Sequence, residues 1–292
     1  MDMVLRLSLR NIKVYIRDRM SVFFSFLSVL IIIGLYALFL GRVQTDGIRG
    51  SAGSLPGIRW LVDSWIIAGL LSVNAVTVSL GVLGTMVFDR EYGRLSDFIV
   101  APASRTGIVV SYLISALVIG LVFTLVAFAA GELYIVAAGG SLLPPLGILK
   151  VTGLLALSVL SSSSIMFLLA SLLASGSAFG VLSTLLGTLI GFITGVYVPM
   201  GILPDAVQRF VALVPFSHSA ALLRQELCRG PMSLVFSGAP PAVQTRYLKM
   251  YGVTLFWGGT EISTAAMLGV LAGVAVVFLG LSALKLRRYG KG

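Results

Sequence analysis

Residues 151–204, VTGLLALSVLSSSSIMFLLASLLASGSAFGVLSTLLGTLIGFITGVYVPMGILP, form a run of 54 residues without a charged side chain. A helix needs about 20 apolar residues to cross the hydrocarbon core of a membrane, so this run is too long for one crossing. Glycine and serine tolerate the backbone angles of tight turns. The run therefore predicts two membrane-spanning helices, at about 151–174 and 178–198, with ASGSAFG as the tight turn between them.

The rest of the 292-residue chain has the same apolar character. Hydrophobic residues make up 58% of it and charged residues 11%, with a mean hydropathy of +1.03, whereas soluble domains carry about 25% charged residues. The apolar runs are continuous, which indicates helices rather than the alternating strands of a barrel. We expect an all-α integral membrane protein with a single transmembrane domain over residues 1–292. Its other four spans are predicted at 20–41, 64–88, 106–131 and 262–284, which makes six.

Basic residues are distributed unevenly between the two sides of this predicted bundle. Six spans place both termini on one side, where twelve Lys and Arg residues lie in the N-terminal segment, the 89–105 loop and the C-terminal tail, against four in the short loops of the other side. Lys and Arg accumulate on cytoplasmic segments of membrane proteins. The pattern predicts that both termini and the 89–105 loop are cytoplasmic. It also accounts for the net charge of +10 by contact with the lipid bilayer, without nucleic acid as a partner.

Residues 1–19 are predicted to form an amphipathic helix in the membrane interface. Basic residues recur there at spacings of four, three and four, which places them on one stripe of a helix, and an apolar row with the same spacing lies beside them. The pattern is imperfect, and a plain basic tail that only orients the chain is the alternative. The stripe consists of Arg6, Arg10, Lys13 and Arg17, and the row of Leu5, Leu9, Ile12 and Ile16.

Few residues could carry chemistry of their own. The single Cys228 excludes an internal disulfide, the single His218 cannot build a multi-histidine metal site, and no G-x-x-x-x-G-K-[ST] phosphate-binding loop is present. We therefore expect no metal and no cofactor in this chain. Transporters driven by ion gradients usually carry ionisable residues inside their spans. The predicted spans contain essentially none, and Glu132, at the outer end of the third, is expected at the interface; a gradient-driven transporter would depend on it. An ion-gradient-driven transporter or channel, and a membrane scaffold or membrane enzyme, stay open as alternatives.

Two motifs resemble one family, the type-2 permease subunits of ATP-binding-cassette (ABC) exporters. The first is FDREYGRLSDFIVAPASR (88–105), a charged stretch between two apolar runs, in which Arg94 stands where the family commonly has threonine. The second is GVYVPMGILPDAVQRFVALVPFSHSAALLRQEL (195–227). The order of elements along the chain agrees as well. The matching residues are Asp89, Arg90, Glu91, Gly93, Leu95, Pro102, Ser104 and Arg105 in the first motif, and Pro199, Pro204, Pro215 and Arg224 in the second.

The resemblance implies a transport subunit, not an enzyme, in the plasma membrane of a prokaryote. It pairs with a second permease subunit, for which we expect a homodimer, and with two copies of a cytoplasmic ATPase that bind ATP and Mg²⁺. An exposed helix at about 89–100, ended by Pro102, would dock into the ATPase and receive its motion. The expected coupling residues are Asp89, Arg90, Glu91, Tyr92, Gly93, Arg94, Leu95, Asp97, Pro102, Ser104 and Arg105.

The segment 199–260 before the last span is predicted to form re-entrant helices and an extracytoplasmic cap, and its first part, 199–217, resembles the short re-entrant helices of that family. Irregular backbone at membrane depth is tolerated only where protein buries it or where it lines a cavity, so we expect 199–217 to roof the transport path. The remainder, 218–260, is predicted to be helical at 218–228 and otherwise irregular. The apolar spans favour an amphiphilic or apolar cargo, such as a drug-like molecule, a lipid or a hydrophobic peptide. Candidate gate residues are Tyr197, Pro199, Met200, Pro204, Phe210, Pro215 and Phe216.

Overall fold

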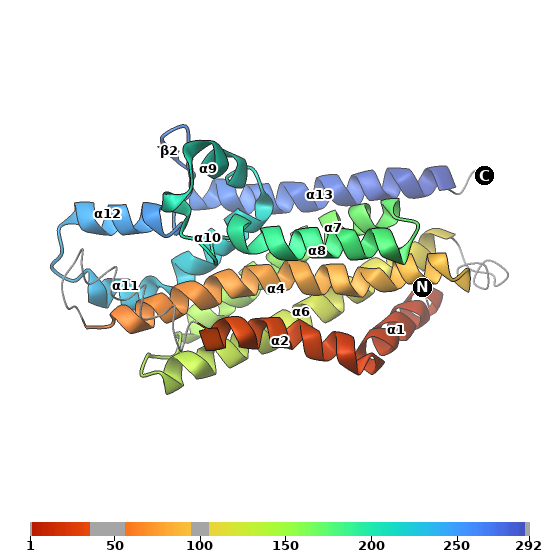
Figure 1. The fold of residues 1–292 in the computed structure, drawn as a ribbon, viewed down its shortest axis with the longest axis horizontal. Helices are drawn as coiled ribbons and strands as arrows, with labels where there is room; N and C mark the ends of the chain where they lie inside the picture. The colour runs from red at the N-terminus through yellow and green to blue at the C-terminus, as the bar shows by residue number, and fades with distance from the viewer. Residues whose placement is uncertain (1, 36–55, 95–104, 290–292) are drawn as a thin grey trace.

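The computed structural model describes residues 2–35, 56–94 and 105–289. Long apolar helices run side by side as a bundle (Figure 1). Helices are the expected form because every backbone N–H and C=O inside hydrocarbon must find its partner within the chain. The bundle helices are α2 (Arg19–Leu35), α4 (Ile58–Glu91), α6 (Arg105–Ala137), α7 (Pro145–Leu172), α8 (Gly176–Ile193) and α13 (Thr264–Tyr289).

Five of the described helices are long and apolar enough to cross a membrane, namely α4, α6, α7, α8 and α13. They overlap the last five predicted spans, so the multi-pass all-α class is confirmed. The predicted first span, 20–41, coincides with α2 as far as Leu35, and residues 36–41 lie outside the described residues. The helices α9 (Asp205–Val211) and α10 (Pro215–Leu227) form a further apolar pair, bent by 87° at the break between them.

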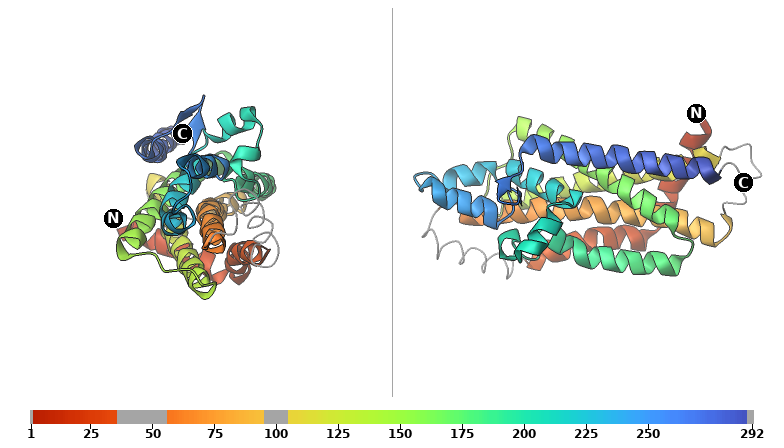
Figure 2. Two further views of the ribbon diagram at one scale, coloured as in Figure 1. Left: turned by 90° about the vertical axis from the view of Figure 1, so that its left-hand side faces the viewer. Right: turned by 90° about the horizontal axis from the view of Figure 1, so that it is seen from above.

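The central helix of the bundle is α4. In its most apolar stretch 83% of the residues are buried, and α6, α7, α8 and α10 pack around it (Figure 2). Small residues allow the helices to approach closely. The Ser79 hydroxyl of α4 lies 2.9 Å from the Ser163 hydroxyl of α7, and a Cβ atom on Gly120 of α6 would come within 2.9 Å of Val159. The core is therefore held by tight helix contacts as well as by apolar burial.

The connection between α7 and α8 lies at the start of the predicted turn ASGSAFG, whose residues 176–180 instead form the first turn of α8. It is short, because α7 ends at Leu172 and α8 begins at Gly176. Ser175 caps α8, accepting a hydrogen bond from the Ala178 N–H at 3.3 Å. A serine at this position satisfies one of the free N–H groups of the first turn.

The N-terminal helix α1 (Asp2–Arg17) packs on α6 and bends into α2 at Asp18. The Asp18 carboxylate accepts hydrogen bonds from the Ser21 N–H at 3.1 Å and from its hydroxyl at 2.6 Å, and these bonds hold the pKa of Asp18 below its usual value. Leu5, Leu9 and Ile16 of the predicted apolar row are exposed, while Ile12 packs on the core. Three members of the apolar row thus lie on a face of α1 that the chain leaves uncovered.

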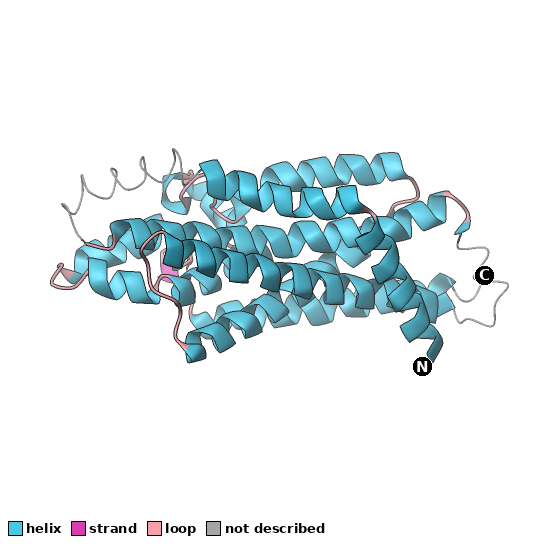
Figure 3. Cartoon of the chain, turned by 90° about the horizontal axis from the view of Figure 1, so that it is seen from below, coloured by secondary structure: helices cyan, strands magenta, loops and turns pink. Residues whose placement is uncertain are grey.

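A small cap, residues 228–261, follows α10. It consists of α11 (Arg229–Val235), α12 (Pro241–Met250) and an antiparallel pair of two-residue strands, β1 (Phe256–Trp257) and β2 (Thr260–Glu261). Figure 3 shows that helices dominate the chain. The prediction that 218–260 is irregular beyond residue 228 was wrong, because α12 has a proline at N1 and buries Tyr247 against Phe236.

Both ends of the described chain lie at the same end of the bundle. The start of α1 and the end of α13 are drawn beside the end of α4, while the cap lies at the opposite end (Figure 1). We call the first the charged end, because Asp89, Arg90, Glu91 and Arg94 lie there, and the second the cap end. The arrangement agrees with an even number of crossings between α1 and the C-terminus.

Candidate functional site

At the charged end a buried carboxylate, Asp89, joins three elements. It lies in the last turn of α4, with 2% of its surface exposed. Arg10 of α1 donates to both carboxylate oxygens of Asp89, from Nη1 to Oδ2 and from Nη2 to Oδ1 at 3.4 Å. The Tyr112 hydroxyl of α6 donates at 2.7 Å and Arg94 at 3.3 Å. A charge removed from water in this way needs such partners, so Asp89 ties α1, α6 and the end of α4 together.

The ion pair between Arg10 and Asp89 stabilises the charged form of the arginine. The hydrogen bond to Asp89 raises the pKa of Arg10 above its ordinary value, against the opposing effect of partial burial. A short chain of polar contacts continues along α1. The Asn11 amide donates to the Ser111 hydroxyl at 3.1 Å, and the Ser115 hydroxyl donates to the Ser8 carbonyl at 3.1 Å. The face of α1 that meets α6 is thus polar.

Arg90 connects the end of α4 to the turn between α7 and α8. Its guanidinium donates to the Ser171 carbonyl at 3.1 Å and to the Leu173 carbonyl at 3.0 Å. These are carbonyls at the end of a helix, which lack partners within the helix. A displacement of Arg90 would therefore move the end of α7 and the turn that leads into α8.

Glu91, Tyr92 and Arg94 lie at the surface of the charged end, with Arg94 also bonded to Asp89. All three are exposed, Tyr92 to 66%, and the Arg94 guanidinium lies 5.3 Å from the centre of the Tyr92 ring. The helix ends at Glu91, and Gly93 has a φ of 70°, a left-handed conformation that glycine adopts without strain. These residues present charge and an aromatic ring on a fixed base.

The predicted exposed helix at about 89–100 needs correction in its first residues. Asp89 and Glu91 belong to α4, and Asp89 is buried by its partners instead of facing a partner protein. The part of the stretch from residue 95 to 104, with Leu95, Asp97, Pro102 and Ser104, lies outside the described residues. Arg105 begins α6, and its side chain is likewise outside the description.

The structure divides the predicted gate residues into two groups. Tyr197 and Phe210 are exposed. Met200 and Phe216 are buried, each with 6% of its surface exposed. The Phe216 carbonyl accepts a hydrogen bond from the Ser72 hydroxyl of α4 at 2.9 Å, so this residue is part of the core. Three prolines mark helix starts: Pro199 precedes η2 (Met200–Ile202), Pro204 precedes α9, and Pro215 is the first residue of α10.

Comparison with known families identifies the chain. The family model described as ABC-2 type transporter matches residues 4–227, which is from α1 to the last residue of α10. The chain belongs to the ABC-2 type transporter family. No curated protein matches it. The ABC-2 match makes this chain a multi-pass membrane protein and the permease subunit of an ABC transporter.

The match includes Arg224, which the structure places in the core of this ABC-2 permease. Its side chain is fully buried, its guanidinium carbon lies 4.6 Å from the centre of the Trp65 ring, and it donates to the Gly252 carbonyl at 3.4 Å. A Cβ atom on Gly69 would come within 3.1 Å of the guanidinium, and one on Gly252 within 3.2 Å. Glycines thus leave the space that a buried arginine needs between α4, α10 and the cap.

Sequence reasoning missed several members of the charged end. Tyr112 and Ser111 carry no signal in the sequence, since hydroxyls inside an apolar run are common in packed helices. Arg10 belongs to the predicted basic stripe, but its partner Asp89 is 79 positions away. The pairing could be found only once the fold brings α1 against α4 and α6.

Proposed function

We propose that this ABC-2 permease is the membrane subunit of an exporter that a separate cytoplasmic ATPase drives at the charged end. The observation that supports this most directly is the contrast within one short stretch. Asp89 and Arg90 bond to α1, α6 and the α7–α8 turn, while the neighbouring Glu91, Tyr92 and Arg94 are exposed. A push on the exposed residues would therefore reach the bundle through bonded side chains.

The absence of charge from the middle of the described spans supports an external energy source. The acidic residues of α4 and α6 lie near the helix ends, at Asp63, Asp89, Glu91 and Glu132, and α8 has no charged residue. An ion-coupled carrier usually binds its ion at a charged group within the spans. We therefore place the ion-gradient alternative second, with Glu132 as the residue on which it depends.

We further propose six spans, with α2 as the first and the bent pair of α9 and α10 as a re-entrant segment. α2 has 17 described residues, all of them uncharged except the first, Arg19, and they make about 26 Å of helix at 1.5 Å per residue. The bend of 87° brings α9 out of line with α10. Export of an amphiphilic or apolar cargo from a prokaryotic cell rests on the family resemblance and on the apolar spans.

The orientation can be measured by labelling with a membrane-impermeant maleimide. The native Cys228 is buried, and burial raises the pKa of its thiol to about 12, so we expect no labelling of this residue. We expect Tyr92→Cys to be labelled in inside-out vesicles and not in intact cells, and Trp257→Cys, at the cap end, to show the reverse. Labelling of Tyr92→Cys should rise when urea strips peripheral subunits from the vesicles. Labelling of Tyr92→Cys in intact cells would contradict the proposal.

A second copy of the chain is proposed to pack on α8. The outer face of this helix is a row of exposed apolar residues at spacings of four, four and three, and the exposed Tyr197 contacts its last member, Phe192, edge to face at 5.3 Å. A row of this kind suits a helix–helix seam beside a transport path. The row consists of Val181, Leu185, Leu189 and Phe192.

The α8 interface predicts a specific crosslink. In membranes, Leu185→Cys should form dimers with a short bis-maleimide at several times the yield of Val277→Cys, which is equally exposed at 56% against 55% but lies on α13. The wild-type chain should give none because Cys228 is buried. Equal yields from the two variants would mean that lipid covers both helices alike.

A further inference from the structure

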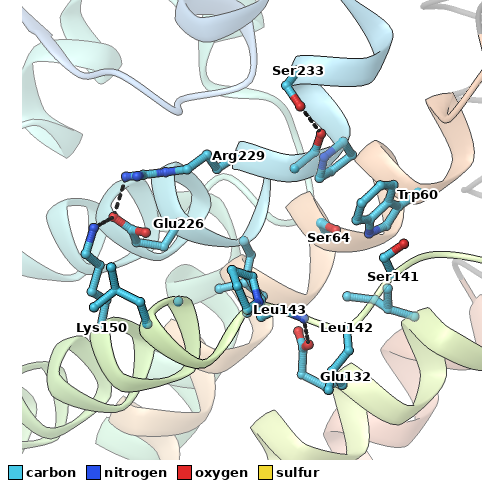
Figure 4. A pocket seen from close by; sticks show the side chains of 17 residues that line it. Trp60, Ser64, Glu132, Ser141, Leu142, Leu143, Lys150, Glu226, Arg229 and Ser233 are labelled. Carbon is cyan, nitrogen blue, oxygen red and sulfur yellow. Dashed lines mark hydrogen bonds and ion pairs between the residues drawn. The ribbon is translucent and has the colours of Figure 1, made fainter.

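A pocket of about 270 Å³ lies at the cap end, far along α4 from Asp89. It is enclosed by the first turns of α4 and α7, the last turns of α6 and α10, the loop between α6 and α7, and α11 (Figure 4). Its walls are mostly apolar, with Trp60, Leu142 and Leu146 among them. Pockets for drug-sized ligands have volumes from about 300 Å³ upward, so this one suits a smaller molecule.

Glu132 is a buried acid in this pocket that lacks a counter-charge. Its side chain is 5% exposed, and one of its oxygens accepts a hydrogen bond from the Leu143 N–H at 3.0 Å. Among the described residues no lysine or arginine pairs with it. The other acid of the pocket, Glu226, has two such partners, Lys150 at 3.8 Å and Arg229 at 2.7 Å. The two acids and two bases of the lining balance in number, but both bases lie at Glu226, so Glu132 is the acid without a neighbouring counter-charge.

Ser64 provides a second, independent polar group. Its side chain is fully buried on the first turns of α4, it lines the same pocket, and its hydroxyl has no hydrogen-bond partner among the described residues. A buried hydroxyl without a hydrogen-bond partner is unfavourable, because it has lost its bonds to water. A bound group with a positive charge and a hydrogen-bond donor would give Glu132 a counter-charge and the Ser64 hydroxyl a hydrogen-bond partner.

We propose that this pocket binds a compact amine with an apolar body. Its ammonium group would pair with the Glu132 carboxylate and with the Ser64 hydroxyl, and its apolar part would lie against Trp60 and the leucines of the pocket wall. The Trp60 ring also offers a π face, which attracts a cation. The structural role of Glu132, which fixes the α6–α7 loop through Leu143, does not explain why a carboxylate stands there, since an amide oxygen accepts the same bond.

The test uses 2-phenylethylamine and its neutral analogue 2-phenylethanol, titrated by calorimetry into the full chain in lipid nanodiscs, with empty nanodiscs subtracted. We expect the amine to bind at least tenfold more tightly than the alcohol. Glu132→Gln keeps an oxygen for the Leu143 N–H, so it should melt like wild type but bind the amine at least tenfold more weakly. The matched control Glu261→Gln removes an exposed acid on β2 and should leave amine binding unchanged.

A second variant covers the case in which Glu132→Gln does not fold. Ser141 is exposed at the pocket and lines it, so Ser141→Phe should obstruct the pocket without disturbing the core and should abolish binding of the amine. Equal affinities for amine and alcohol, no saturable binding, or amine binding unchanged by Ser141→Phe would each overturn the proposal. The measurement needs no ATPase and no nucleotide, so its outcome is independent of the proposed transport function.

Discussion

Replacing Arg224 by alanine is expected to lower the free energy of unfolding by about 3 kcal/mol, because a large buried side chain leaves a cavity and its bonded carbonyl loses a partner. Arg224 lies between Trp65 and the Gly252 carbonyl, where α4, α10 and the cap meet. Trp65 in turn donates to the Tyr251 carbonyl at 2.6 Å. Loss of the arginine should therefore loosen the cap before it unfolds the bundle.

Cys228 reports this loosening directly. It is fully buried in the cluster that includes Trp65 and Tyr247, next to the end of α10. We expect Arg224→Ala to increase the rate of maleimide labelling of Cys228 at least tenfold and to lower the melting temperature. Arg224→Met restores packing volume without the charge and should recover part of the loss. Wild-type labelling rate and melting temperature in Arg224→Ala would show that the arginine does not hold the cap.

Asp89→Asn is expected to uncouple the permease from its ATPase while the chain still folds. Asparagine keeps the shape of the side chain but leaves the Arg10 guanidinium without its counter-charge. Breaking a buried pair costs about 3–5 kcal/mol, and we expect about 1–3 kcal/mol here because the Arg10 side chain is 31% exposed and partly screened by solvent.

The matched comparison for Asp89→Asn is Arg94→Gln, which removes the most exposed partner of the same carboxylate, at 54% exposure. In the purified complex of permease and ATPase, we expect Asp89→Asn to reduce ATP hydrolysis stimulated by the permease at least tenfold, and Arg94→Gln to reduce it less than threefold. If both variants hydrolyse ATP at the wild-type rate, the Asp89 network is a structural tie without a part in coupling.

The features that local pattern determines could be predicted from the sequence. The 54-residue uncharged run predicts two helices, α7 and α8, because a single helix of that length is much longer than one crossing of a bilayer. Ser175 occupies the N-cap position of α8, where serine is favoured. The polar face of α1 could not be predicted in this way. The apolar and basic rows of α1 do not show that Ser8 and Asn11 face the bundle. Their inward orientation depends on Ser111 and Ser115, about a hundred residues away.

The helix α12, which we predicted as irregular, could have been found from the sequence. Residues 241–250, PAVQTRYLKM, begin with a proline and place Val243 and Tyr247 four residues apart, which is the pattern of a short amphipathic helix. The Gly and Pro residues on either side, in RGPM, GAPP and YGVTLFWGG, favour turns and irregular backbone instead. The exposure of Asp89 was misjudged for a different reason, since a cluster of charges predicts solvent contact on average, and only the fold shows which member turns inward.

The most direct test of the ATP-driven account is purification of the tagged full chain from its own host's membranes in mild detergent, followed by mass spectrometry. We predict stoichiometric recovery of a soluble subunit with a G-x-x-x-x-G-K-[ST] loop. Glu91→Arg reverses an exposed charge at the charged end and should reduce that recovery at least fivefold, whereas Glu261→Arg, at the cap end, should not. Recovery of the chain without any such ATPase, or equal recovery with both variants, would contradict the account.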